Sequence, residues 1–522
     1  MVWVGLGQAA GASKAPVVTA ATQVNIDPNP VRAHSTPLLA RNPTNGELVV
    51  ADVDVRGSRE CMVHISTDDG RSWFPGGEIM VKPYTDCSIG AEYGPHVMPF
   101  FDRDGVLYVT TTASDPTVFA SSSLPSNTAK GARAFVPRNV YLSRSTDGGR
   151  SFTTALVYKG PENDPGRGYN ISPTGAVDPN DPRRVYIGWA RGDWTSPKLS
   201  DTVEAVVAAS SDGGKTFSEP VDLSTPNASE HTWLTVGRDG AVRAAYWSKG
   251  FGTPLASEFL PIPIARQDAP PIYYTASTDH GKTWNRQVID PGNQKYYRPP
   301  VIAADPHSDA IYIAWYSTPE VMNFQDDGAG KVRSDIFLRA STDGGKTWAA
   351  RKVVNDDAGN GANHELPGLS IAPNGRLDVA WDDFRLSPSP GASPDRENGI
   401  DNIFYASSSD HGATFGPNIQ VNDRSIDRSI GVWSNNVGSH AAVGIASTAD
   451  AVYFAWQDSR NGTVVNQSED IYASSLRLNG TAAATHTAGA PRWLLLGAGI
   501  ALGLGSAMVF VWGLGRRRRR VG

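Results

Sequence analysis

Short runs of mostly apolar residues recur along most of the chain, separated by turns rich in Gly, Asp and Ser. Some of these runs end in an aromatic residue, as in Ala310–Tyr316 (AIYIAWY), Arg376–Trp381 (RLDVAW) and Ala451–Trp456 (AVYFAW). A second kind, such as Ile336–Ala340 and Ile403–Ser407, comes after a longer loop. Runs of this length that are rich in β-branched and aromatic residues are typical of strands. The pattern therefore predicts an all-β protein built from repeated groups of four antiparallel strands.

One turn motif marks the repeat. The pattern Ser-x-Asp-x-Gly-x-x-Trp/Phe occurs in six copies, at Ser66–Trp73, Ser145–Phe152, Ser210–Phe217, Ser277–Trp284, Ser341–Trp348 and Ser408–Phe415. Its Asp can accept N–H bonds across its own turn, and its Gly supplies the positive φ that a tight hairpin needs. Four strands for each period of roughly 66 residues describe the blade of a β-propeller.

The number of blades follows from counting the second strand of the repeat, which in most units ends in an aromatic residue. It occurs seven times, at Glu47–Val53, Val106–Thr112, Arg184–Trp189, Ala241–Trp247, Ala310–Tyr316, Arg376–Trp381 and Ala451–Trp456. The seventh unit, 443–476, has no Asp turn and no fourth strand. The N-terminal segment Thr19–Ile26 resembles the fourth strand Thr414–Asn422, and closing the ring with it removes exposed sheet edges. The sequence therefore predicts a seven-bladed propeller over residues 15–477, with six blades as the alternative.

The C-terminal region predicts a membrane anchor. Trp493–Gly515 is an uncharged stretch long enough to cross a bilayer, with a Trp near each end. Arg516–Arg520 follows it and is expected on the cytoplasmic side. We expect a stalk over 478–491, a single transmembrane helix over 492–515 and a basic cytoplasmic tail over 516–522. The propeller would then lie outside the cytoplasm, at the cell membrane.

Charge and cysteine content refine the compartment. The net charge is −6 although five arginines cluster in the tail, so the remainder is acidic and a nucleic-acid partner is not expected. Residues 1–14 have small residues suited to cleavage and are interpreted as the remnant of a signal peptide. Cys61 and Cys87 are the only cysteines. In an exported protein they could form a disulfide, and two buried free thiols are the alternative.

The six Asp turns resemble the Asp boxes, or bacterial neuraminidase repeats, of sialidase-like propellers. The resemblance covers roughly Ala15 to Leu476. It implies the propeller fold, in which the Asp box has a structural role. Similar boxes belong to glycan-cleaving propellers, sorting receptors and assembly factors, so fold alone does not assign the activity.

Histidine recurs at the start of the first strand of the repeat. Five of the seven units carry it there, at His34, His96, His231, His364 and His440. The ring of imidazoles would surround one mouth of the central channel. Each His could cap its own strand, or the ring could bind a ligand. No cofactor is predicted, and a metal held by a subset of the ring stays an alternative, since a single ion cannot reach all five.

A second pattern lies at the ends of the aromatic-ending strands. Asp54-Val-Arg56, Asp383-Phe-Arg385 and Asp458-Ser-Arg460 share one register in units that are consecutive around the closed ring. These groups could be local ion pairs that brace the loops. They could equally form a site for a glycan or a carboxylate, because Arg grips anionic groups with two hydrogen bonds.

The resemblance also implies a site. Family sialidases use three Arg, a Tyr nucleophile with a Glu partner, and an Asp acid/base. Ser35 stands where the first family Arg is expected, and Arg298-Pro-Pro300 offers a similar triplet in another unit. The candidate catalytic residues are Tyr297, Glu365, Asp54 and Asp383, and the candidate substrate-binding residues are Arg298, Arg56, Arg385, Arg460, His34, His96, His231, His364 and His440.

The resulting functional hypothesis is a membrane-anchored, extracytoplasmic, sialidase-like glycoside hydrolase that acts on glycans. Two alternatives remain open. One is a non-catalytic propeller that binds a glycan or a cell-surface protein, and the other is an assembly factor or receptor module.

Overall fold

The computed structural model describes residues 15–26, 32–54, 60–79, 97–114, 138–161, 169–192, 204–223, 229–248, 271–291, 296–297, 300–318, 334–388, 399–431 and 443–478. The chain divides into two compact units, Val18–Leu478 and a second made of Met1–Val17 and Asn479–Gly522. Only residues 15–17 of the second unit are described, so the fold is that of Val18–Leu478.

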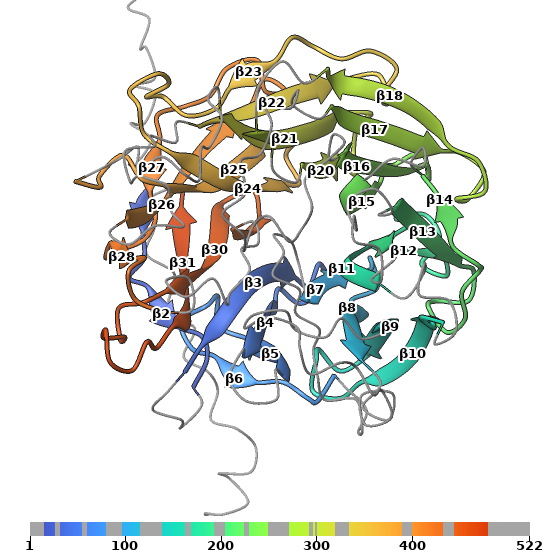
Figure 1. The fold of residues 1–522 in the computed structure, drawn as a ribbon, viewed down its shortest axis with the longest axis horizontal. Coiled ribbons are helices and arrows are strands. Elements are labelled where there is room, and N and C mark those ends of the chain that lie inside the picture. Colours follow the sequence, from blue (N-terminus) through green and yellow to red (C-terminus); the bar gives the residue numbers. More distant parts are fainter. Residues whose placement is uncertain are drawn as a thin grey trace, which may run out of the picture. The chain divides into compact units, whose positions relative to one another are not determined.

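Seven antiparallel sheets follow one another around a ring (Figure 1). Each sheet is a blade, numbered here from the first complete one. Blade 1 comprises β3 (His34–Arg41), β4 (Leu48–Asp54), β5 (Glu60–Ser66) and β6 (Phe74–Pro75). Blade 2 comprises β7 (Val97–Phe101), β8 (Leu107–Ser114), β9 (Arg138–Ser145) and β10 (Thr153–Tyr158). Blade 3 comprises β11 (Tyr169–Val177), β12 (Val185–Gly192), β13 (Glu204–Ser210) and β14 (Val221–Asp222).

The other four blades repeat this order. Blade 4 comprises β15 (Ser229–Val236), β16 (Val242–Ser248), β17 (Ile272–Ser277) and β18 (Asn285–Asp290). Blade 5 comprises β19 (Tyr296–Tyr297), β20 (Val301–Ala304), β21 (Ile311–Thr318), β22 (Asp335–Ser341) and β23 (Lys352–Val353). Blade 6 comprises β24 (His364–Ile371), β25 (Leu377–Asp383), β26 (Ile400–Ser408), β27 (Ile419–Gln420) and β28 (Ile426–Asp427). Blade 7 comprises β29 (Gly444–Ser447), β30 (Ala451–Asp458) and β31 (Asp470–Arg477), with β1 (Val17–Val18) and β2 (Thr22–Gln23) in the same sheet.

The ring is closed by the N-terminal segment, as the sequence predicts. Strand β2 pairs antiparallel with β31, with Thr22 opposite Ala473. Beyond it, the Val24 N–H donates to the Ile471 carbonyl at 2.8 Å, and the Asn25 side chain bonds Asp470 at 2.8 Å. The seven-bladed architecture and the closing strand are therefore confirmed, and the six-bladed alternative is wrong.

The six Asp turns have one shared geometry. In Ser341–Trp348, the Ser341 hydroxyl bonds an Asp343 carboxylate oxygen at 2.8 Å, and the Gly345 N–H donates to the Ser341 hydroxyl at 2.9 Å. The Thr347 hydroxyl donates to the other Asp343 oxygen at 2.6 Å. These bonds to the charged carboxylate hold the pKa of Asp343 well below its ordinary range. The predicted turn is confirmed, and its Asp is occupied by the turn itself.

Side chains of one strand alternate between the two neighbouring blades. Trp381 in β25 packs in a cluster with Tyr312 of blade 5, whereas Ala380 packs with Val443 of blade 7. In blade 1, Val50 packs with Tyr453 of blade 7. Successive residues near the ends of these strands therefore face different neighbouring blades. Because of this alternation, the polar groups described below lie in separate interfaces between blades.

Among the described residues, no helix combines the length and apolarity that a membrane crossing needs. The predicted span at 493–515, the basic tail, the stalk from Asn479 onwards and the signal remnant at 1–14 lie outside those residues. Cys61 is disulfide-bonded, and its predicted partner Cys87 also lies outside them.

Candidate functional site

The inner strand of several blades starts with a bulge. Register shifts follow Ser35 in β3, Ile171 in β11 and Glu365 in β24. The bulge residues Thr36, Ser172 and Leu366 have φ values of 55°, 51° and 54°. A positive φ in residues other than Gly is strained, and bulges redirect the side chains beside them. The strain lies at the strand starts where the sequence places its histidines.

In blade 6, His364 is held between a carbonyl and two carboxylates. Its Nδ1 lies 2.5 Å from the Ser334 carbonyl oxygen, and its Nε2 lies 3.0 Å from Asp357 and 3.5 Å from Asp383. Burial on its own lowers the pKa of His364, but the two carboxylates prevail and raise it. Burial likewise opposes the charge on Asp357, yet His364 and Arg385 hold the pKa of Asp357 well below its ordinary range. This imidazole is therefore favoured as a cation.

The Asp-x-Arg pairs of blades 6 and 7 form the same ion-paired arrangement. Arg385 Nη2 lies 2.9 Å from Asp383, whose carboxylate also accepts a bond from the Trp381 indole at 2.8 Å. The guanidinium of Arg385 stacks over Phe404 at 4.4 Å. Blade 7 repeats these contacts. Arg460 Nη2 lies 2.7 Å from Asp458, and the Trp456 indole donates to the same carboxylate at 3.0 Å. The Arg460 guanidinium stacks over Tyr472 at 3.9 Å. Both guanidiniums brace the loops, which is one of the two interpretations that the sequence leaves open.

On the opposite face of blade 6 lies a carboxylate cluster, made of Glu365, Asp382, Asp401 and Arg428. Glu365 stands opposite Asp382 across the pairing of β24 with β25. Arg428 donates from Nε to Asp401 at 2.9 Å, and its Nη2 contacts Asp401 and lies 3.3 Å from Asp382. All four residues are at most 5% exposed. Two carboxyl groups, Asp401 and Asp382, thus share one buried guanidinium, while Glu365 accepts a bond from the Asn363 amide.

The charge balance of the cluster favours a protonated Asp382. Burial, then the neighbouring Asp401 carboxylate, raises the pKa of Asp382 well above its ordinary range, and Glu365 adds to the effect. Arg428 opposes it, but its closest contacts are with Asp401. We therefore assign the negative charge of the pair to Asp401 and the proton to Asp382. A carboxylic acid beside carboxylates is the arrangement that general acid–base chemistry uses.

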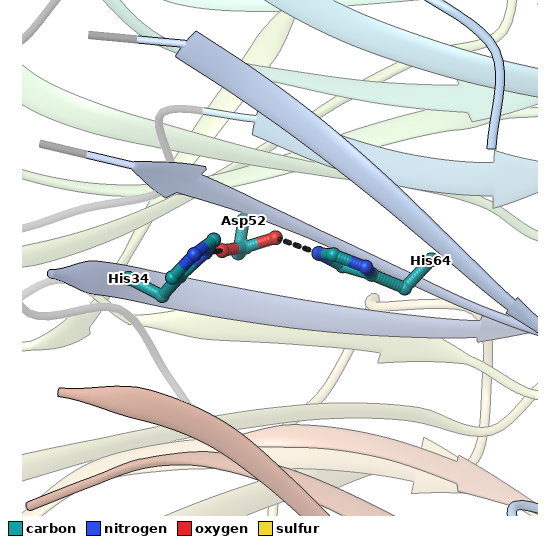
Figure 2. Close-up of side chains that lie close together, drawn as sticks. All are labelled: His34, Asp52 and His64. Carbon is teal, nitrogen blue, oxygen red and sulfur yellow. Dashed lines mark hydrogen bonds and ion pairs between the residues drawn. The ribbon is translucent and has the colours of Figure 1, made fainter. Parts of the chain in front are cut away.

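A third polar group lies inside blade 1. Figure 2 shows the Asp52 carboxylate between the rings of His34 and His64. His34 Nδ1 contacts one carboxylate oxygen, and His64 Nε2 lies 2.8 Å from the other. The three residues are at most 2% exposed. Burial would raise the pKa of Asp52, but the two imidazoles hold it well below its ordinary range.

The structure separates the candidates that the sequence groups together. Glu365 faces blade 7, whereas Asp383 faces blade 5 with His364. Asp54 lies in blade 1, opposite His34. Tyr297 in β19 and His231 in β15 are placed by their backbone pairing only. Arg298, Arg56, His96 and His440 lie outside the described residues.

Several central groups are not among the sequence candidates, namely Asp52, His64, Asp357, Asp382, Asp401 and Arg428. Asp52 and Asp382 had a signal, since each is a charged residue in a buried strand, but Asp378 and Asp383 share that signal in β25. Arg428 had none, because it follows a loop and meets Asp382 only through the fold.

Comparisons with known proteins add little beyond this geometry. No family model and no curated protein matches the chain. Among solved structures, it is similar to a Dyadobacter fermentans protein of unknown function, with 15% identity, 89% and 99% of the two chains covered, and a TM-score of 0.46. It is also similar to a Hadza microbial sialidase, with 14% identity, coverage of 82% and 75%, and a TM-score of 0.41. The α-L-arabinofuranosidase of Fusarium graminearum shows 11% identity, coverage of 88% and 98%, and a TM-score of 0.44. These values are too low to bear on function, so any assignment rests on the site.

Proposed function

We propose that the chain is an extracytoplasmic, sialidase-like glycoside hydrolase that acts on glycans through the carboxylate cluster. The observation that carries the proposal is the Asp382 carboxyl, which favours its proton next to an Asp401 carboxylate anchored by Arg428. A cluster built only to brace the loops would need equal numbers of carboxylates and cations. Here two carboxyl groups, Asp382 and Asp401, contact one cation, and Glu365 stands opposite Asp382.

Glycoside hydrolysis needs a carboxylic acid to protonate the leaving oxygen and a carboxylate on the other side of the bond. Asp382 is the candidate acid. Glu365 is the candidate carboxylate, because it stands opposite Asp382 on the adjacent strand. Directly opposed residues of antiparallel strands have Cβ atoms about 4.5–5.5 Å apart and project from the same face of the sheet, and retaining enzymes likewise keep their two carboxyl groups close together. The proposal therefore includes retention of anomeric configuration, with Glu365 as nucleophile.

The neighbouring acid Asp383 suits this role less well. Its carboxylate oxygens already accept bonds from the Trp381 indole and from Arg385, which leaves them engaged within the loop. The sequence candidates Tyr297 and Arg298, as nucleophile and substrate-binding residue, stay predictions.

The test is turnover by the purified full-length chain on fluorogenic neutral glycosides and sialosides, measured across pH. Asp382→Asn should lower kcat by about 10²–10⁴, the usual contribution of general acid–base catalysis. Asp356→Asn is the matched control, because Asp356 is a half-exposed partner of Arg385 outside the cluster, and this variant should keep its activity. Equal turnover in both variants, or none by the native chain on any substrate, would overturn the hydrolase. Glycan binding without turnover would then support the non-catalytic alternative.

Membrane anchoring is part of the same proposal. It is supported by the uncharged stretch 493–515 and the basic tail after it. Deleting residues 492–522 should move the chain from the membrane fraction to the soluble exported fraction. Unchanged fractionation would contradict the anchor without touching the proposed chemistry.

A further inference from the structure

One core position of the repeat is aromatic in most blades. It is the fifth residue of the second strand, or the sixth in blade 7, where that strand starts one residue earlier. Five blades fill it with a side chain that is at most 2% exposed, namely Trp189, Tyr246, Trp315, Trp381 and Trp456. An aromatic ring at this position is therefore compatible with the packing of most blades.

Blade 1 departs from this pattern. The equivalent residue is Asp52, which is fully buried. On the next strand, His64 stands opposite Val50. At the corresponding position five blades place a small residue and blade 5 places Arg339; the small residues are Ser143, Ala208, Thr275, Ala406 and Ser474. Blade 1 thus exchanges a large ring and a small residue for a carboxylate and an imidazole. His34, from the strained start of β3, completes the trio.

The fold does not account for this exchange. Buried ion pairs are often no more stable than well-packed hydrophobic groups of similar volume, because charges lose their hydration on burial. Five other blades show that the apolar solution is available at this position. A local departure from the packing pattern, without a gain in stability, is typical of a functional site.

We propose that His34, Asp52 and His64 bind a divalent transition metal of the zinc class, a site that does not depend on the proposed hydrolase activity. Two imidazoles and one carboxylate are a donor set that such ions prefer. Their ligand atoms lie within 4.8 Å of one another. Donors about 2.0–2.1 Å from a tetrahedral ion are separated by roughly 3.3 Å, so small side-chain movements suffice.

The proton balance of binding is defined by the contacts. His34 Nδ1 and His64 Nε2 both face the Asp52 carboxylate. Each would bind the ion through its lone pair as a neutral ring, so its remaining proton lies on the other ring nitrogen, and a ring that starts doubly protonated releases one proton to solvent. Asp52 would supply the third donor as a carboxylate. Three protein donors leave one position of a tetrahedral ion for another ligand.

Blade 6 supplies an internal comparison. Asp357, His364 and Asp383 also lie close enough together to hold an ion. There, however, the Arg385 guanidinium lies 3.0 Å from Asp357 and 2.9 Å from Asp383, through the same carboxylate oxygens that face His364. A cation already occupies that site, so the proposal is confined to blade 1. The sequence left open a metal bound by several histidines of the ring. In the site proposed here, only His34 belongs to that ring, and Asp52 and His64 do not.

The experiment is metal analysis of the full-length chain, purified without chelator and also refolded with Zn²⁺ or Co²⁺. We expect about one ion per chain and a visible absorption band for bound Co²⁺ that is typical of a site with few ligands. Asp52→Asn should weaken Zn²⁺ binding by at least about 100-fold, since even outer-shell changes weaken binding by 10–100-fold. His364→Gln is the matched control and should leave metal content unchanged.

A second variant covers the case in which Asp52→Asn fails to fold. The double change Asp52→Trp with His64→Ala restores the aromatic and small residue of the other blades, and should give a folded chain without metal. Metal retained in this variant would overturn the proposal. So would a native chain that holds no Zn²⁺ or Co²⁺ after refolding with either ion, because the trio is then only a hydrogen-bonded core.

Discussion

Replacing Arg428 by Met tests the charge assignment in the carboxylate cluster. The Arg428 side chain is 3% exposed and its main partner, Asp401, is fully buried. Met keeps the length of the apolar stem but leaves Asp401 with the Asp383 N–H at 3.1 Å and the Asp382 carboxyl. Removing one partner of a buried ion pair costs about 3–5 kcal/mol. We expect a loss of this size at about pH 8, measured by urea denaturation and Trp fluorescence on the full-length chain.

The loss should depend on pH. Burial already raises the pKa of Asp401 and Arg428 opposes that rise, so removing the guanidinium raises it further and penalises the variant most when Asp401 must be charged. The difference between variant and native chain should therefore shrink towards about pH 5. The double variant Arg428→Met/Asp401→Asn removes the stranded charge and should recover most of the stability. A single variant that loses less than about 1 kcal/mol, or a double variant no more stable than the single, would refute the assignment.

Three further outcomes follow from the contacts. Asp357 and Asp383 raise the pKa of His364, so the stabilisation by this residue is complete below about pH 6.5 and is lost as pH rises through its pKa in the folded chain. His364→Gln should therefore remove the fall in the urea denaturation midpoint over this pH range. An unchanged pH dependence would contradict the contacts. Asn25→Ala should cost about 1–3 kcal/mol in urea denaturation, since it leaves the buried Ile471 N–H without its acceptor and removes one of the donors to Asp470, and a neutral effect would argue against the N-terminal closure. Asp343→Ala should lower the Tm without loss of β-sheet circular dichroism, because its bonds hold only one surface turn, and loss of the fold would show that the turn does more.

The propeller could be predicted because its signals are local. Each Asp turn fixes its own hairpin through bonds within eight residues, as in Ser341–Trp348. The second strand of each blade is a recognisable run of mostly apolar residues, which gives the blade count, and the missing seventh turn points to the N-terminal strand. None of these steps requires knowledge of which blades touch.

The site could be predicted only in part, because its chemistry depends on neighbouring blades. The shared register of His34 and His364 suggested one role, but His364 meets the Ser334 carbonyl of blade 5, and His34 meets Asp52 of its own blade. Strand parity alone could have shown that Asp382 and Asp383 point to opposite interfaces. Which of them remains protonated depends on Arg428, whose position after a loop carries no sequence pattern.

In a repeat protein, the positions at which one blade differs from the others are therefore the most informative about function. Features shared by several blades, such as the Asp turns and the Trp–Asp–Arg arrangement of blades 6 and 7, are satisfied internally and hold the ring together. Features confined to one blade do not have that explanation. Asp52 stands where five blades bury an aromatic ring, and Asp382, whose pKa is raised by burial and by Asp401, stands where blade 7 places the neutral Gln457. Because the fold tolerates the common solution at both positions, the chemistry of this protein is best sought at these two carboxyl groups.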